Sequence, residues 1–272
     1  MKIENNKQSS QEEVSEQELA YLELQADMGV TKHMGGLKAT EELIELCYIG
    51  KGKYVLDVGC GIGTTACYLA KRYGCRVVGV DISEKMIDWS KKRAKIEGVD
   101  DRVKFMVADA QNLPFEDALF DVVICESVNA FIEDKQRAVS EYVRVTKPGG
   151  YVGLNEATWI KAQPPTGFVE YFSSTVEKVE FLTSDGWEEL LEGSGFKDIV
   201  VRTYKVSALG ELIDRVKLLG FKRILGAWYR LLSVYVVDSA YRRYTKKLIK
   251  ESLNMPKGIL EYWGYGIYVG RK

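Results

Sequence analysis

One stretch constrains the fold of this chain more than any other: residues 54–70, with the sequence YVLDVGCGIGTTACYLA. Near its start, Val55, Leu56 and Val58 give the aliphatic and β-branched pattern typical of a strand covered on both faces. Three glycines follow at alternate positions: Gly59, Gly61 and Gly63. A backbone without Cβ atoms can turn sharply there and let a ligand approach its N–H groups. A helical pattern resumes at Thr64, so the stretch predicts a strand, a nucleotide-binding turn and a helix.

The glycine spacing separates two classes of cofactor. The dinucleotide fingerprint G-x-G-x-x-G requires a glycine where this chain has Thr64. The pattern here is D-x-G-x-G-x-G and starts at Asp57. A carboxylate at this position repels a pyrophosphate but suits a ligand that carries an ammonium group. A nicotinamide-dependent oxidoreductase is therefore the weaker alternative.

The motif VLDVGCGIG resembles the first motif of class I S-adenosylmethionine-dependent methyltransferases, and the chain is similar to their small-molecule and quinone-type branch. The resemblance covers residues 37–206 and the last strand. It implies a Rossmann-like, doubly wound α/β fold with seven strands, mostly parallel, and an antiparallel last strand. It also implies that S-adenosylmethionine is bound at the carboxyl ends of the first four strands. The residues implied are Asp57, Gly59, Gly61, Gly63, Asp81, Ile82, Asp109, Ala110 and Glu126.

Two acids have specific expected roles in cofactor binding. Asp81 ends the predicted strand CRVVGVD, roughly 20 residues beyond the glycines, where an acid faces the ribose hydroxyls. The alternative is that Asp81 caps a helix, since Ser83 opens one. Asp109 follows the predicted strand 102–107, and the resemblance implies that it contacts the adenine amino group. The alternative for Asp109 is a turn residue that satisfies local N–H groups.

Two residues are candidates for the catalytic centre. Glu126 lies near the end of the predicted strand Phe120–Ser127, which resembles the family's fourth motif, but it could instead cap the next helix. His33 is the only histidine and lies in the segment Met28–Gly36, before a predicted helix over 37–49. In methyltransferases of this kind the N-terminal segment lies over the cofactor, although a lone histidine is more often a surface residue. A base is required only if the acceptor is a hydroxyl or a carbon acid.

The remaining pattern predicts four parts of the chain. Residues 1–36 are a leader and cofactor lid, 37–206 the methyltransferase core, 207–256 an inserted helical cap and 257–272 the last core strand. Within the core, further helices are expected over 83–97, 134–146 and 184–193, and strands over 151–155 and 196–204, with the last strand over 262–270. The segment KPGG at 147–150 predicts a turn. An irregular aromatic stretch from Glu156 to Phe181 is expected to form the wall of the acceptor pocket.

The inserted segment 209–253 combines apolar positions at helical spacing with many basic residues. The apolar positions are Leu212, Val216, Leu219, Phe221, Leu225, Trp228, Leu232 and Tyr235. The simplest interpretation is a helical cap with a solvated basic face. The alternative is a lid that accepts an amphipathic or anionic substrate, or that rests on a membrane surface. The expected partner is a small-molecule or lipid-like acceptor.

Composition excludes several other classes. The net charge of −1 over 272 residues does not favour nucleic acid as a partner. The five cysteines form no C-x-x-C pair, so neither a zinc site nor a disulfide framework is expected. The polar first residues do not resemble a signal peptide and no run of apolar residues is long enough to span a bilayer, so a cytoplasmic protein is expected. We therefore expect a methyltransferase that acts by in-line displacement on a small or amphipathic acceptor; the main alternative is a non-catalytic module that binds S-adenosylmethionine.

Overall fold

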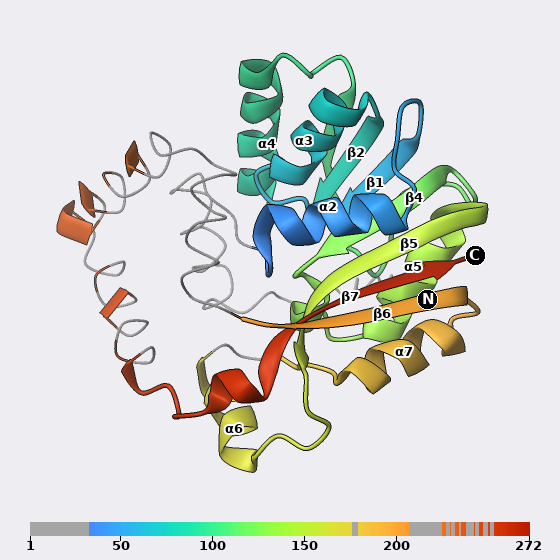
Figure 1. Ribbon diagram of the computed structural model, residues 1–272. Coiled ribbons are helices and arrows are strands. Elements are labelled where there is room, and N and C mark those ends of the chain that lie inside the picture. The colour runs from blue at the N-terminus through green and yellow to red at the C-terminus, as the bar shows by residue number, and fades with distance from the viewer. Residues whose placement is uncertain are drawn as a thin grey trace, which may run out of the picture.

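The computed structural model describes residues 33–175, 179–206 and 253–272, together with single residues and short groups within 225–250. In this part of the chain seven strands form one sheet in the order β3-β2-β1-β4-β5-β7-β6 (Figure 1). The strands are β1 (Tyr54–Val58), β2 (Arg76–Asp81), β3 (Val103–Val107), β4 (Phe120–Glu126), β5 (Thr146–Trp159), β6 (Lys197–Lys205) and β7 (Trp263–Arg271). The helices are α2 (Gly36–Leu46), α3 (Thr64–Tyr73), α4 (Glu84–Glu97), α5 (Lys135–Val145), α6 (Thr166–Thr175) and α7 (Ser184–Gly193), with 3₁₀ turns η1 (Asn129–Phe131) and η2 (Ile259–Glu261).

The strand order confirms the predicted doubly wound fold. Strand β1 pairs in parallel with β2 on one side and with β4 on the other. Strand β7 pairs antiparallel with both of its neighbours, β5 and β6. The strands β1, β2 and β3 follow one another toward one edge of the sheet, and β4 then starts on the other side of β1. The topological switch point therefore lies between β1 and β4. Ligands of open α/β sheets bind beside such a switch point, at the carboxyl ends of the strands.

Helices cover both faces of the sheet, and each face has its own core (Figure 1). Helices α2, α3 and α4 pack on one face, and α5 and α7 pack on the other. Successive strand residues point to opposite faces, so the neighbours Val55 and Leu56 enter different cores. Both are fully buried, and each such side chain stabilises the fold by about 1.5–3 kcal/mol. The glycine turn after β1 is thus carried by a strand that is held from both sides.

Two segments differ from the sequence-based expectation. The predicted turn Lys147–Gly150 is wrong as a separate turn, because these residues form the irregular start of β5, where the register with β4 shifts and Gly149 has φ 76°. The stretch from Glu156 is not wholly irregular either: β5 continues to Trp159, and α6 follows. The reason is tertiary, since Glu156–Trp159 pair with Trp263–Gly266 of β7, which are far away in the sequence.

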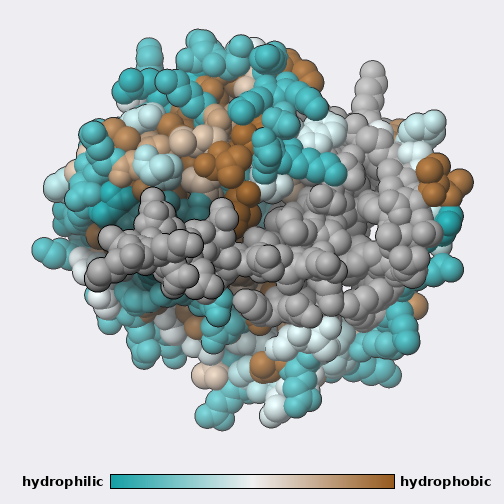
Figure 2. All heavy atoms as spheres, turned by 180° about the vertical axis from the view of Figure 1, so that it is seen from behind, coloured by the Kyte–Doolittle hydropathy of each residue, from teal (hydrophilic) through white to brown (hydrophobic). Residues whose placement is uncertain are grey.

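Several expectations lie partly outside the described residues. The leader and the lid segment up to Lys32 belong to this group, as do Phe221 and Trp228. Most of the described residues of the predicted cap, such as Leu225 and Val236, are helical. No helix in the described part of the chain has both the length and the apolar character needed to cross a membrane. On the face shown in Figure 2, hydrophilic side chains cover much of the described surface, and hydrophobic ones show in smaller groups between them.

Candidate functional site

The glycine turn between β1 and α3 has the backbone conformation that its sequence predicts. Gly59, Gly61 and Gly63 all have positive φ, at 69°, 52° and 74°. A Cβ atom on Gly59 would overlap the side chain of Val128, and one on Gly63 would lie 2.7 Å from the Phe105 ring. The first and third glycines therefore allow protein segments to pack closely on this turn.

Three acids meet at the carboxyl ends of neighbouring strands. Asp57 near the end of β1, Asp81 at the end of β2 and Glu126 at the end of β4 are only 2%, 8% and 8% exposed. Burial raises the pKa of Asp57 well above its usual value, and the nearby Glu126 and Asp81 raise it further. Like charges in a medium of low polarity repel one another strongly. A positively charged ligand beside this cluster would relieve that repulsion.

Asp81 ties the second strand to the glycine turn. One carboxyl oxygen accepts a hydrogen bond from the Gly61 N–H at 2.9 Å, and the other accepts from the Ser83 N–H at 2.9 Å. Burial raises the pKa of Asp81, while these hydrogen bonds oppose the shift. Ser83, not Asp81, is the N-cap of α4, because its hydroxyl accepts from the Met86 N–H. A carboxylate has about four acceptor sites, so Asp81 can still accept from a further donor such as a ribose hydroxyl.

Asp57 has a buried oxygen that lacks a partner. No donor in the described part of the chain hydrogen-bonds to its Oδ2 atom, although the carboxyl group accepts a bond from the backbone of Ala66. Buried polar atoms without partners are uncommon and costly. The three acids together offer acceptors and negative charge, which fit the ammonium, sulfonium and ribose hydroxyl groups of S-adenosylmethionine.

Glu126 is held by three segments of the chain. Its two oxygens accept hydrogen bonds from the hydroxyls of Thr40 on α2 and Thr65 on α3, at 2.9 and 2.8 Å. His33 lies beside it, with Nδ1 3.5 Å from Oε1. Glu126 does not cap the helices that follow, because the N-cap of η1 is Val128 and that of α5 is Asp134. The structure therefore brings together both residues expected at the catalytic centre, Glu126 and His33.

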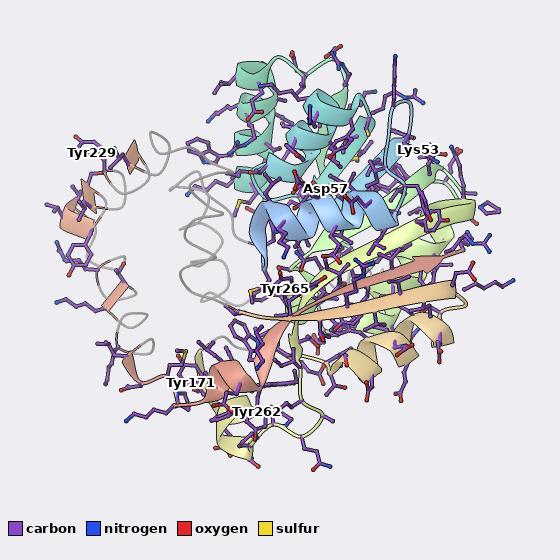
Figure 3. All side chains as sticks on the ribbon, in the orientation of Figure 1. Lys53, Asp57, Tyr171, Tyr229, Tyr262 and Tyr265 are labelled. Atoms are coloured by element: carbon purple, nitrogen blue, oxygen red, sulfur yellow. The ribbon has the colours of Figure 1, made fainter. Side chains whose placement is uncertain are left out.

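The segment before α2 is fixed at its backbone. The Met34 N–H donates to Ser127 Oγ at 2.9 Å, and Asn155 Nδ2 donates to the Met34 carbonyl at 2.7 Å. Gly35 has φ 72°, and a Cβ atom there would lie 2.5 Å from the Tyr265 ring. Figure 3 shows Tyr265 near the N-terminal end of α2. Sequence reasoning missed Asn155 and Tyr265, because no local motif marks them.

The residues expected to hold the adenine lie at the neighbouring strand ends. Ile82 directly follows β2 and is 50% exposed, so its aliphatic side chain is available to a flat ring. Asp109 follows β3 and is exposed, and its Oδ1 accepts a hydrogen bond from the Gln111 N–H at 2.8 Å. Ala110 beside it is half-buried. Asp109 thus makes the local turn contact expected of a turn residue, and its other carboxyl oxygen can still accept a hydrogen bond from a ligand.

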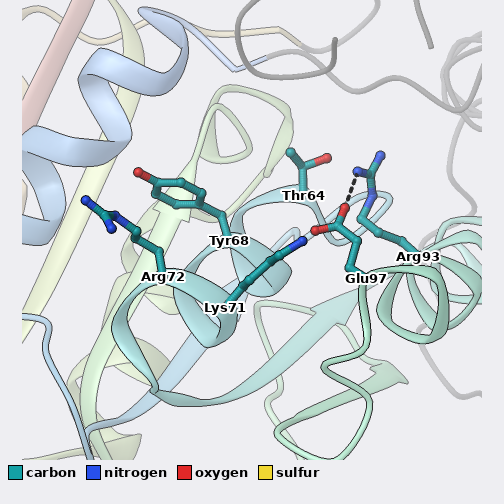
Figure 4. Close-up of a pocket in the computed structure, with 6 residues that line it drawn as sticks. All are labelled: Thr64, Tyr68, Lys71, Arg72, Arg93 and Glu97. Carbon is teal, nitrogen blue, oxygen red and sulfur yellow. Dashed lines mark hydrogen bonds and ion pairs between the residues drawn. The ribbon is translucent and has the colours of Figure 1, made fainter. Parts of the chain in front are cut away.

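A surface pocket between α3 and α4 is separate from this cluster. It has a volume of about 250 Å³ and is lined by Thr64, Tyr68, Lys71, Arg72, Arg93 and Glu97 (Figure 4). Glu97 forms an ion pair with Arg93 at 3.2 Å. None of the three buried acids lines this pocket. Within the described residues no group of His, Cys, Asp and Glu side chains has the arrangement of a metal site, and all five cysteines are buried outside any disulfide.

Comparison with known sequences identifies related proteins. A family model described as "Methyltransferase domain" matches residues 56–154. An uncharacterised protein of Haemophilus influenzae is 34% identical over 177 residues, which are 64% of this chain and 70% of that protein. Phosphoethanolamine N-methyltransferase 1 of Arabidopsis thaliana is 32% identical over 67% of this chain, which spans only 37% of the plant enzyme.

Comparison with solved structures identifies the same fold. The [4+2]-cyclase SpnF has a TM-score of 0.74 at 21% identity, over 94% of this chain and 96% of that one. Phosphoethanolamine N-methyltransferase 2 of Haemonchus contortus, in complex with phosphomonomethylethanolamine and S-adenosylhomocysteine, has a TM-score of 0.70 at 22% identity, over 94% of this chain and 58% of that one. At these identities the likeness establishes the fold and not the reaction.

Proposed function

Because the chain belongs to the class I S-adenosylmethionine-dependent methyltransferases, we propose that it transfers a methyl group to a small or amphipathic acceptor. The observation that carries this proposal is the cluster of Asp57, Asp81 and Glu126, in which a buried Asp57 oxygen has no partner among the described residues. S-adenosylmethionine, when bound, supplies a methyl group activated by its sulfonium centre, which an acceptor takes by in-line displacement.

The positions of the candidate cofactor-binding residues support a role for each of them. Asp57 would hold the ammonium group, and Asp81 would accept hydrogen bonds from the ribose hydroxyls. The glycine turn would let the cofactor approach the backbone of Gly61, whose φ is positive. Asp109, Ala110 and Ile82 would surround the adenine. The protein thereby fixes the orientation of the donor, which is the main requirement for a displacement of this kind.

Glu126 and His33 would act on the acceptor side. Thr40 and Thr65 fix both oxygens of Glu126, and His33 Nδ1 is 3.5 Å from Oε1. A carboxyl group beside an imidazole can orient the ring. His33 would then take the proton of a hydroxyl or carbon acceptor, whereas an amine acceptor that arrives neutral needs no base.

The nature of the acceptor is suggested by the relatives and by segment 207–256. The matched plant and nematode enzymes are named for phosphoethanolamine, a small amine with an anionic group. The segment carries aromatic and aliphatic residues together with many Lys and Arg residues. Apolar walls with a few charges suit an apolar molecule with an anionic head group. Peripheral contact with a membrane surface through the basic helices is the alternative role of this segment.

Calorimetry with S-adenosylhomocysteine tests the cofactor half of the proposal. Gly61→Val should block binding, because a branched side chain closes the approach to the turn. Asp81→Ala should weaken binding by about 1.5–3 kcal/mol, the usual cost of a lost hydrogen bond to a charged group. Unchanged affinity in both variants would refute the assignment.

A methylation screen tests the acceptor half. The protein is incubated with radiolabelled S-adenosylmethionine and a panel of quinones, isoprenoid lipids and phosphorylated or free small amines. Label transferred to one class names the acceptor. A protein that binds the cofactor tightly but labels no member of the panel, nor any component of a small-molecule extract, would favour the non-catalytic alternative.

A further inference from the structure

The loop after β4 connects the parts of the candidate site. Its residues Ser127–Asn129 lie between the glycine turn and the segment before α2. The side chain of Val128 fills the space that the missing Cβ atom of Gly59 leaves open. Ser127 has φ 60° and accepts the hydrogen bond from the Met34 N–H. Any displacement of this loop would therefore reach both the turn and the lid segment.

Glu156 on β5 holds this loop from the other face of the sheet. The carboxyl group is fully buried, and its Oε1 atom accepts hydrogen bonds from the Val128 N–H at 3.2 Å, the Asn129 N–H at 3.0 Å and Asn129 Nδ2 at 2.8 Å. Tyr142 on α5 donates its hydroxyl to Asn129 Oδ1 at 3.0 Å, which fixes the orientation of the amide. Three donors from one loop thus converge on a single oxygen.

The stability of the fold does not by itself account for a carboxyl group at the position of Glu156. Burying an ionisable group without a cation usually costs more than burying an apolar residue of the same size. Among the described residues, Cys125, Tyr142 and Tyr268 interact electrostatically with Glu156, and none of these three is a cation. Its Oε2 atom has no partner in the described part of the chain. The loop gives a reason for a carboxyl group at position 156. The chain leaves the sheet at Ser127, which has a left-handed conformation, and the N–H groups that follow are bonded by neither a strand nor a helix, so they need another acceptor.

We propose that Glu156 is a positioning residue for the cofactor site: it fixes Ser127–Asn129 against Gly59 and Met34, and so promotes cofactor binding without touching the cofactor. Asn155, the preceding residue, points to the opposite face and holds the Met34 carbonyl. The end of β5 therefore holds the loop on one face and the lid segment on the other. This inference rests on the proposed function, since it assigns Glu156 to the same site.

Two measurements on three variants test the proposal. Glu156→Ala removes the acceptor, and Glu156→Gln keeps a carbonyl oxygen in its place. Thr158→Val is the matched control, because Thr158 is buried on the same face of β5 and its hydroxyl bonds to the Leu182 carbonyl, away from the loop. Hydrogen exchange of the Val128 and Asn129 amides is followed without cofactor, and affinity for S-adenosylhomocysteine is measured by calorimetry.

The expected pattern separates positioning from general stability. In Glu156→Ala the two amides should exchange at least about tenfold faster and the cofactor product should bind roughly tenfold more weakly, as for the loss of one net hydrogen bond. Glu156→Gln should restore both values to within about threefold of wild type on the same scale. Thr158→Val should lower the melting temperature and leave the affinity unchanged.

Other outcomes overturn the proposal. It is wrong if Glu156→Ala binds normally, if Glu156→Gln binds as weakly as Glu156→Ala, or if Thr158→Val weakens binding as much. If Glu156→Ala does not fold, Asn129→Ala replaces it, and normal binding by that variant is equally decisive. A wild-type protein that does not bind S-adenosylhomocysteine refutes the proposed function instead; amide exchange, measured without cofactor, then still decides whether Glu156 holds the loop.

Discussion

At the scale of single residues, the candidate site is a set of buried acids that stability alone does not favour. Asp57, Asp81 and Glu156 all have raised pKa values, and burial is the largest cause in each case. Groups with strongly perturbed pKa values gather at functional sites, because binding and catalysis require environments that folding would avoid. For Asp57 and Glu156 we predict effects on protein stability that differ from the effects on cofactor binding.

Replacement of Asp57 by asparagine should have opposite effects on folding and on binding. The amide removes a buried negative charge beside Asp81 and Glu126, so the melting temperature should rise or stay the same. Affinity for S-adenosylhomocysteine should fall by about 1.5–3 kcal/mol, since the ammonium group loses its charged acceptor. Calorimetry and a thermal melt provide the two readings. The control is Asp117→Asn, at an exposed ion pair with Arg144, which should change neither by much. Equal affinity in Asp57→Asn and wild type would contradict the assignment.

Glu156 should make the stability of the protein fall as the pH rises. Its pKa is raised to about 7 from a usual 4.5, because the carboxyl group is fully buried; the hydrogen bonds from Asn129 and Val128 lower the pKa but offset only part of this effect. Between these two values the unfolded chain loses a proton that the folded chain keeps, so the folded state loses up to about 3 kcal/mol relative to the unfolded state. Above the raised pKa the effect levels off.

The variant Glu156→Gln measures how much the titration of Glu156 contributes to the free energy of unfolding, because a glutamine side chain does not titrate. The free energy of unfolding of Glu156→Gln, relative to wild type, should increase by up to about 3 kcal/mol between pH 4.5 and pH 8. Urea denaturation at several pH values checks it. Asp57 and Asp81 titrate in both proteins, so their contributions cancel in the difference. A difference that is the same at both ends of the range would mean that Glu156 keeps an ordinary pKa.

At the scale of elements, the residues at the entry to α2 fix the end of the N-terminal segment against the sheet. Gly35 and Gly36 both have positive φ, and Gly35 lies against the Tyr265 ring of β7. The hydrogen bonds of Met34 fix the same entry to β4 and β5. His33 reaches Glu126 because the chain is held at this point. The position of a candidate catalytic side chain thus depends on a turn and not on a strand.

Gly35→Ala should therefore disturb the site more than a comparable glycine elsewhere. Both Gly35 and Gly52 have positive φ, so alanine at either position should cost about 1 kcal/mol of backbone strain. Only at Gly35 does the new methyl group meet a side chain, since nothing lies within 4 Å at Gly52. Gly35→Ala should increase hydrogen exchange at Met34 and weaken cofactor binding, whereas Gly52→Ala should only lower the melting temperature. Similar cofactor affinities in the two variants would argue that the lid segment is ordinary packing.

At the scale of the whole molecule, we propose that the sheet binds the cofactor and that segment 207–256 selects the acceptor. The three buried acids come from β1, β2 and β4, and the glycine turn precedes α3. Lys205, the last residue of β6, pairs with Gly264 near the start of β7. The two ends of the inserted segment are thus attached to adjacent antiparallel strands. A segment inserted at such a point can change acceptor choice without altering the nucleotide-binding half.

Replacement of residues 207–256 by a short flexible linker should keep cofactor binding and abolish turnover. The β6–β7 pair can still form, because its register is set along the whole of β6. Calorimetry with S-adenosylhomocysteine should give an affinity within about threefold of wild type. Methyl transfer to the acceptor found in the screen should be lost. Full turnover by the shortened protein would place the acceptor elsewhere.

The sequence by itself determined the class of fold and the outline of the candidate cofactor site. The run Val55–Val58, the alternating glycines and the acids at strand ends are local patterns, and local patterns are governed by backbone sterics and by the period of the strand. Parallel strands end at one edge of a sheet, so the places of Asp57, Asp81 and Glu126 in the chain are enough to predict that these acids lie near one another.

Only the tertiary structure decided which side chains surround these acids. Thr40 and Thr65 reach Glu126 across 86 and 61 residues of sequence, and Asn155 reaches Met34 across 121. The length of β5 was likewise set by pairing with β7, and the fit of Val128 against Gly59 by the approach of two loops. A hydroxyl on a helix or an amide on a strand has no local signature. The hydrogen-bond partner of such a side chain is determined by the packing of the two cores. A buried polar group forms a hydrogen bond with a donor or acceptor that lies nearby in the folded chain.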